Sequence, residues 1–182
     1  IQAIHQIEGS VDLIDELVEK GLARQSDAEN FDVHDLVREF LLRSMEHEMK
    51  TDLHASAVKW YRGKMDDAAD RIEFIHHLSQ TGAEEGLAEV LLTEGHGLVS
   101  SGHTELLSIL NSLESSDFDT KSRGLIRELK GDILTIQGRW DEAEKQYDAA
   151  TKHVGANMPS SELARLLSAR ADIAVKLSLI HI

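Results

Sequence analysis

Ten histidines make metal binding the first chemistry to consider for this sequence, which contains no cysteine. Two pairs stand out, the adjacent His76 and His77 and the nearby His96 and His103. Adjacent residues on a helix point about 100° apart, however, and a zinc site requires three or four convergent ligands. Two glycines also lie between His96 and His103, so these residues need not share one helix. We therefore expect no metal site and interpret these histidines as solvated or capping side chains.

His34 and Asp35 lie where a short predicted strand meets a predicted helix. Phe31 and Val33 are apolar residues that alternate around Asp32, and helical spacing of apolar residues begins after Asp35. A histidine there lies beside the free N–H groups and the positive end of the helix dipole, which suits a bound anion. The alternative interpretation is that the two residues only end the strand and cap the helix.

Sequence patterns typical of enzymes are absent. The chain contains no GxxxxGK[ST], GxSxG, HExxH or GxGxxG, and it has no cysteine nucleophile. The acidic pairs Asp66–Asp67 and Glu84–Glu85 lack the alternating oxygen ligands and central glycine of a calcium loop, so we expect them to stabilise helix starts. We expect this fragment itself not to be an enzyme.

Composition favours one or two small, mainly helical domains. The 182 residues are 41% hydrophobic and 29% charged, close to the average of folded chains, which allows a sizeable core. Eight aromatic residues, twelve glycines and one proline are too few for a many-stranded sandwich with its frequent turns. The formal net charge of −14 makes nucleic acid and anionic membranes poor partners.

The sequence also bears on location. No apolar run approaches the roughly 20 residues of a membrane helix, and the first residues do not resemble a signal peptide. The lack of cysteine fits a reducing compartment. We therefore expect a cytoplasmic protein without a membrane partner.

Residues 1–50 are predicted to form a winged-helix domain. A helix begins at Ser10 and ends before Gly21, a hairpin follows with its turn at 26–30, and a second helix begins at Asp35. The apolar residues of this second helix form one stripe: Leu36, Val37, Phe40 and Leu41. Helix, two-stranded wing and helix in this order are the end of a winged-helix unit.

Both ends of the sequence suggest a fragment. The chain starts with Ile1 rather than Met, and helical spacing already begins at Ile4 without a preceding cap, so we expect the winged-helix domain to be N-terminally truncated. Residues 177–182 read LSLIHI, which resembles a translation of the transposase adapter used for sequencing libraries. We hypothesise that these six residues are a cloning or assembly scar. The alternative is an ordinary apolar helix end.

Residues 51–122 are predicted to form a helical linker or superhelical domain. Glycines and serines divide this region into helix-length segments, at Gly63, Gly82, Gly95 to Gly97, Gly102 and Ser115–Ser116. Short connections of this kind favour antiparallel helix pairs. We expect each apolar stripe to bury one helix face against a neighbour, as for Leu53, Ala57, Trp60 and Tyr61.

Residues 123–176 contain the clearest internal repeat. The segment LKGDILTIQGRWDEAEKQYDAA resembles one complete 34-residue tetratricopeptide unit, with small residues for close helix contact, a turn glycine and interlocking aromatic residues. The predicted repeat core consists of Gly131, Gly138, Trp140, Ala143, Tyr147 and Ala150. Pro159 marks the start of a second, truncated repeat, whose first helix is 161–176. The fold class is therefore a winged helix followed by an α-solenoid.

A second resemblance concerns residues 10–45. The string VHDLVREFLL, residues 33–42, resembles the histidine–aspartate motif in the winged-helix domain of signal-transduction ATPases with numerous domains. With LVEKGLARQ, residues 17–25, it is most similar to archaeal and bacterial members in which helical repeats follow this domain. The resemblance implies that His34 contacts the β-phosphate of bound ADP and that Asp35 supports that corner. The valine before His34 replaces the methionine usual in plant members, a conservative apolar change.

The second resemblance implies a non-catalytic regulatory part of a nucleotide-switched signalling ATPase. ATP or ADP with magnesium would bind an upstream domain in cis, the winged helix would relay the nucleotide state, and the repeats would sense a ligand or protein partner. The hypothesis also includes the formation of an oligomer by the protein when it is activated.

Two alternatives stay open. One is a free-standing tetratricopeptide-type adaptor for protein–protein interaction. The other is a winged-helix transcription regulator, although residues 1–50 hold twelve acidic and five basic side chains and lack the basic footprint of a DNA-binding surface.

Overall fold

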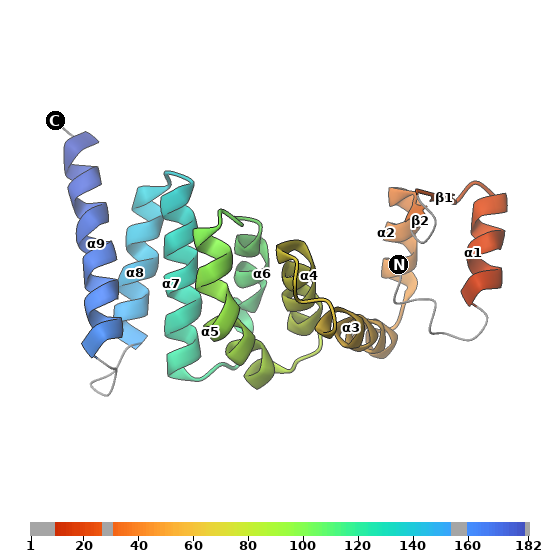
Figure 1. Cartoon of the computed structure of the whole chain (residues 1–182), viewed down its shortest axis with the longest axis horizontal. Coiled ribbons are helices and arrows are strands. Elements are labelled where there is room, and N and C mark those ends of the chain that lie inside the picture. Colours follow the sequence, from red (N-terminus) through yellow and green to blue (C-terminus); the bar gives the residue numbers. More distant parts are fainter. Residues whose placement is uncertain (1–9, 27–30, 154–159, 181–182) are drawn as a thin grey trace.

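The computed structural model of the chain describes residues 10–26, 31–153 and 160–180. Within these ranges the protein is mainly helical, with nine α-helices and one two-stranded antiparallel sheet. Figure 1 shows the helices arranged along the long axis of the molecule, from α1 at one end to α9 at the other, with α5 and α6 overlapping along this axis. The prediction of a mainly helical protein with a small hairpin is confirmed.

The N-terminal unit consists of a helix, a hairpin and a helix. Helix α1 (Ser10–Glu19) is followed by Gly21, whose φ of +68° is the left-handed conformation that glycine adopts most easily. Strand β1 (Ala23–Gln25) pairs antiparallel with β2 (Phe31–Val33), and helix α2 (Asp35–Ser44) follows directly. These elements lie where the sequence predicted them.

The apolar stripe of α2 is exposed rather than packed against a neighbour. Leu36 and Phe40 are 70% and 69% exposed, and no residue of α2 is buried. Within residues 14–26 and 31–44, Ile14 and Ala23 are the only buried apolar side chains. No described element covers this face of α2.

The middle of the chain forms one hydrophobic core. It contains α3 (His47–Arg62), α4 (Ala68–Ser79), α5 (Glu84–Ser100), α6 (Leu106–Ser112) and the short 3₁₀ helix η2 (Leu113–Ser115). The same core also includes the following helix, α7 (Thr120–Ile136). Its completely buried residues pack these helices against one another: Ile75, Leu91, Leu106, Leu110, Leu129 and Ile133.

Acidic side chains begin two of these helices. Asp67 is the N-cap of α4, where its Oδ1 accepts a hydrogen bond from the backbone N–H of Ala69 at 3.3 Å. Glu84 and Glu85 lie in the first turn of α5, beside the positive end of the helix dipole. The role expected for these acidic residues at helix starts is confirmed.

The glycines at 95 and 97 do not interrupt α5, contrary to the sequence prediction. Gly95 is buried, and a Cβ atom built there would lie 2.7 Å from Cδ1 of Leu129 on the neighbouring helix. This glycine therefore allows two helices to approach closely instead of ending one. Helix α5 ends at Ser100, before Gly102, which has a φ of +91°.

Helices α7 (Thr120–Ile136), α8 (Trp140–His153) and α9 (Ser160–Ile180) form the C-terminal end of the stack in Figure 1. They share a second hydrophobic cluster whose buried members include Leu166 and Ile173 of α9. Positions 177–180 continue α9, and Leu177 packs against this cluster. No helix in the described part of the chain is both long and apolar enough to cross a bilayer.

Some expectations concern positions outside the described residues: Ile1, Ile4, the turn residues 27–30, Pro159 and residues 181–182. The boundaries placed between residues 50 and 51 and between 122 and 123 fall inside α3 and α7.

Candidate functional site

A groove runs along α5, α7 and α9, which are alternate helices of the stack. Its first part is a cavity of about 250 Å³ lined by the apolar side chains of Leu92 and Leu125 and by the charged Lys121 and Arg165. Its second part, of about 490 Å³, lies farther along α5 and α7. Arg165 lines both cavities, so the two parts adjoin.

Arg165 of α9 and Glu128 of α7 form a two-pronged ion pair inside this groove. Nη1 of Arg165 lies 2.8 Å from Oε1 of Glu128, and Nη2 donates to Oε2 at 3.0 Å. The side chain of Glu128 is only 5% exposed, so its charge depends on a nearby cation. The sequence gives no sign of this pair, because its members are 37 residues apart.

His96 of α5 extends the network. Nη1 of Arg165 lies 2.8 Å from Nε2 of His96 and 3.3 Å from Nδ1, and because a guanidinium only donates, the nearer Nε2 accepts. Nδ1 lies 3.5 Å from Oδ2 of Asp132, whose other oxygen accepts a 2.7 Å hydrogen bond from the Tyr147 hydroxyl. Burial raises the pKa of that hydroxyl, which keeps it a donor at neutral pH. The network joins four helices around the groove.

The network already contains a cation, the guanidinium of Arg165. His96, Glu128 and Asp132 offer three potential ligand atoms within 4.8 Å of one another. Arg165 already contacts both Glu128 and His96. An ion at this position would have to displace the guanidinium, so we interpret the group as an ion-pair network.

The residues predicted for the repeat core lie between α7 and α8. Gly131 faces the ring of Tyr147, which occupies the space that a larger side chain would need. Gly138 has a φ of +72° in the turn between the two helices, and Trp140 is partly buried at the start of α8. The remaining three are buried in the second cluster: Ala143, Tyr147 and Ala150.

His34 is the N-cap of α2. Its Nδ1 accepts a hydrogen bond from the backbone N–H of Leu36 at 3.3 Å. Asp35 lies in the first turn, and its Oδ1 is 3.0 Å from Nη2 of Arg38. The cap that the alternative interpretation gave to His34 and Asp35 together is formed by His34.

His34 and Asp35 also line a wide groove of about 780 Å³ between the hairpin and α2. Two arginines line the same groove, and each has a carboxylate partner. Nη2 of Arg24 lies 3.2 Å from Oδ2 of Asp32. Nη2 of Arg38 lies 3.0 Å from Oδ1 of Asp35. The carboxylates balance part of the positive charge of the two arginines, so an anion bound here would be attracted less strongly than by unpaired arginines.

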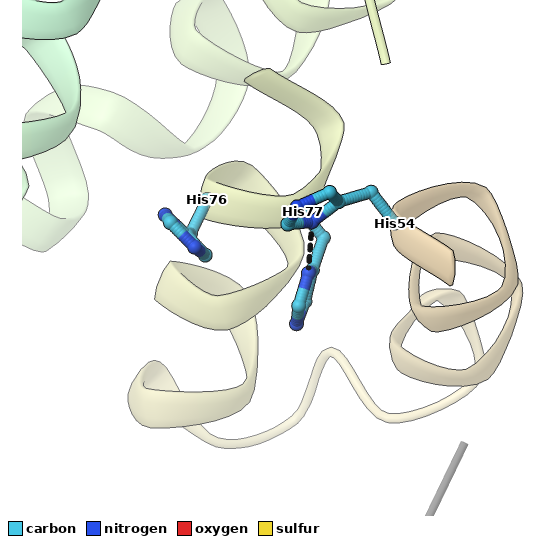
Figure 2. A group of neighbouring side chains, drawn as sticks. All are labelled: His54, His76 and His77. Carbon is cyan, nitrogen blue, oxygen red and sulfur yellow. Dashed lines mark hydrogen bonds between the residues drawn. The ribbon is translucent and has the colours of Figure 1, made fainter. Parts of the chain in front are cut away.

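Three histidines from two helices converge between α3 and α4. Figure 2 shows His54 of α3 reaching toward His76 and His77 of α4, and Nδ1 of His54 lies 2.8 Å from Nδ1 of His77. The pair on α4 is visible in the sequence, whereas His54 is not, because only the packing of α3 on α4 brings it near. His103 does not belong to this group; its Nδ1 lies 2.9 Å from Oε1 of Glu105.

Comparison with known proteins adds the family. The sequence model of the tetratricopeptide repeat-like domain matches residues 15–174, a range that includes α5, α7 and most of α9. No curated protein and no solved structure gave a significant match to the chain.

Proposed function

The chain belongs to the tetratricopeptide repeat-like domain family, and we propose that it is a protein-interaction module whose groove along α5, α7 and α9 binds a segment of a partner protein. Stacked helical repeats form extended binding surfaces of this kind. The observation that carries the proposal is the groove itself, in which Arg165 joins two adjoining cavities.

We propose that the partner segment combines an apolar anchor with basic side chains. Leu92 is 48% exposed and lines the first cavity beside Leu125, so an apolar side chain of the partner would remove their surface from water. Glu89 lines the first cavity and Asp132 the second. The net charge of −14 would speed the approach of a basic segment.

A photo-crosslinker in the groove tests this proposal. Replacing Leu92 with p-benzoylphenylalanine places the reactive group in the first cavity, and the same replacement at the exposed Lys145 of α8 is the matched control outside both cavities. We expect a partner protein to crosslink in cells from position 92 and not from position 145.

The crosslinked partner is then produced separately and titrated with the purified chain. Leu92→Asp should weaken this binding on the order of tenfold or more, since a buried apolar anchor is lost. Equal crosslinking from both positions, or an unchanged affinity of Leu92→Asp, would place the interaction outside the groove.

We further propose that the chain is the regulatory part of a nucleotide-switched signalling ATPase, as the resemblance of residues 10–45 implies. Because Nδ1 of His34 accepts from Leu36, the neutral ring carries its proton on Nε2, which can donate to a phosphate oxygen of ADP. Arg24 and Arg38 line the same groove and add positive charge. The exposed stripe of α2 further supports contact with another domain. Phosphoryl transfer with magnesium would be the chemistry of the upstream domain.

His34→Ala in the full-length protein separates this proposal from a free-standing adaptor. We expect weaker ADP binding and loss of the resting state. Asp67→Ala is the matched control, since it removes the side-chain cap of α4 and should leave ADP affinity unchanged. Unchanged ADP affinity and unchanged activation in His34→Ala would favour the adaptor, whereas salt-dependent binding to duplex DNA would favour a transcription regulator.

A further inference from the structure

The cluster formed by His54, His76 and His77 brings three imidazole rings together between α3 and α4 (Figure 2). One ring nitrogen of each lies within 4.8 Å of the others. The ring centre of His76 is 6.0 Å from that of His54 and 5.2 Å from that of His77. The two neighbours on α4 point in different directions along the helix surface, but His54 approaches from α3 and contacts both rings.

We propose that His54, His76 and His77 together bind one divalent transition-metal ion of the zinc class. Imidazole nitrogen is a preferred ligand of zinc, copper and nickel ions. Two nitrogens bound to one tetrahedral zinc ion at about 2.0–2.1 Å lie roughly 3.3 Å apart. The 2.8 Å contact between His54 and His77 therefore has to open slightly, and the exposed His76 has to turn inward.

The environment of His77 favours this arrangement. Its Nε2, the nitrogen that does not face His54, lies 3.8 Å from Oε2 of Glu73. A carboxylate behind a ligand histidine fixes the proton on the far nitrogen and makes the other nitrogen a better ligand. On the side of α3, the ring of Tyr61 stacks on His77 with a centre distance of 5.6 Å and an angle of 19°. His77 is thus oriented with Nδ1 toward the cluster.

Two of the three rings, those of His54 and His77, favour the neutral form. Burial and the neighbouring rings of His54 and His76 lower the pKa of His77 to about 4, and burial also lowers the pKa of His54. Both rings are therefore neutral at pH 7, which is the form that binds metal ions. On binding, the proton shared by the two Nδ1 atoms moves to Nε2 of its own ring, so no net proton release from these rings is required.

The bound ion would link α3 to α4. His54 comes from one helix and the other two ligands from the next, while the exposed position of His76 leaves the ion accessible to water as a fourth ligand. The cross-link would stabilise the helix pair that joins the N-terminal unit to the rest of the stack.

Titration of the untagged chain with zinc at pH 7 tests the site. Calorimetry should show one equivalent of zinc bound, and zinc should raise the melting temperature, since it binds only the folded cluster. Alanine at His54, His76 or His77 should weaken the affinity by on the order of tenfold or more, and Glu73→Gln by a smaller factor. His47→Ala, on α3 but outside the cluster, is the matched control and should leave zinc binding unchanged.

Circular dichroism of the metal-free variants checks that each one folds. His76→Ala decides the question if the other variants unfold, because this side chain is exposed. The proposal is overturned if zinc neither binds nor stabilises the wild-type chain, or if His76→Ala binds zinc as the wild type does. An equal loss in His47→Ala would show scattered binding to surface histidines and would also overturn it.

Discussion

Gly131 on α7 and Tyr147 on α8 face each other so closely that a Cβ atom on Gly131 would lie 2.7 Å from Cε1 of the tyrosine ring. Three atoms of the ring lie within 2.9 Å of that position. A rigid aromatic ring that is only 2% exposed cannot move aside as a flexible side chain can. The contact between these two helices therefore depends on the absence of a side chain at position 131.

Gly131→Ala should destabilise the protein by about 1–2 kcal/mol. Overpacking typically costs about 1–3 kcal/mol, and the better helix propensity of alanine offsets up to about 1 kcal/mol. Gly97→Ala on α5 is the matched control, because nothing lies within 4 Å of a Cβ atom there. The control should be neutral or stabilising by up to about 1 kcal/mol. Urea unfolding measures both, and equal effects would contradict the close contact.

Tyr147 should contribute more to stability than Trp140. Tyr147→Ala removes a side chain that is 2% exposed and should cost about 3–5 kcal/mol, whereas Trp140 is only partly buried and its replacement by alanine should cost less. Tyr147→Phe removes the 2.7 Å hydrogen bond to Asp132 and the 3.4 Å one with the Thr135 hydroxyl, and it should cost about 1 kcal/mol. Thermal melts that barely move in Tyr147→Ala would remove the repeat assignment.

Stability should fall between pH 6.5 and about 4 because of His77. The unfolded chain binds a proton at this histidine near its ordinary pKa of 6.5, whereas burial holds the folded pKa at about 4. In this window the unfolded state binds more protons, so the free energy of unfolding decreases as the pH is lowered. His77→Gln should flatten this part of the curve. Urea unfolding at several pH values measures this curve. If the free energy of unfolding falls equally in the variant and the wild type as the pH is lowered, groups other than His77 cause the decrease.

Lys130 and Glu114 give a test of a half-exposed ion pair. Nζ of Lys130 lies 2.9 Å from Oε1 of Glu114, and the side chains are 1% and 56% exposed. Glu114→Ala should cost about 1–2 kcal/mol, between a surface pair and a buried one, because water replaces the carboxylate only in part. Lys130→Met should cost less, since it removes the buried charge as well. A larger loss in Lys130→Met than in Glu114→Ala would contradict this reasoning.

Local features were predictable from the sequence, since each depends on a few consecutive residues. Gly21, Gly102 and Gly138 adopt positive φ values at helix ends or turns, and the hairpin and the helix starting at Asp35 lie where the spacing placed them. Gly95 was misinterpreted because the same residue type serves either to end a helix or to let two helices approach. Only the position of Leu129 distinguishes these roles.

Features that depend on tertiary packing were not predictable. His54 and Arg165 each complete a cluster with residues of another helix, and nothing in their immediate sequence marks them. The sequence left the exposure of Phe40 undecided for a related reason, since an apolar stripe shows that a helix face can be covered but does not show which element covers it.

The order of the helices along the stack also determines how the chain can fold. Every helix from α3 to α9 packs mainly on helices that are next, or next but one, in the sequence. Such a topology has low contact order, and its loops close at little entropic cost. We expect rapid folding that begins at α7 and α8, where contact is most extensive, and spreads outward one helix at a time. Unfolding would then start with the helices at the two ends of the stack. Of the three helices that form the groove, α7 would unfold last.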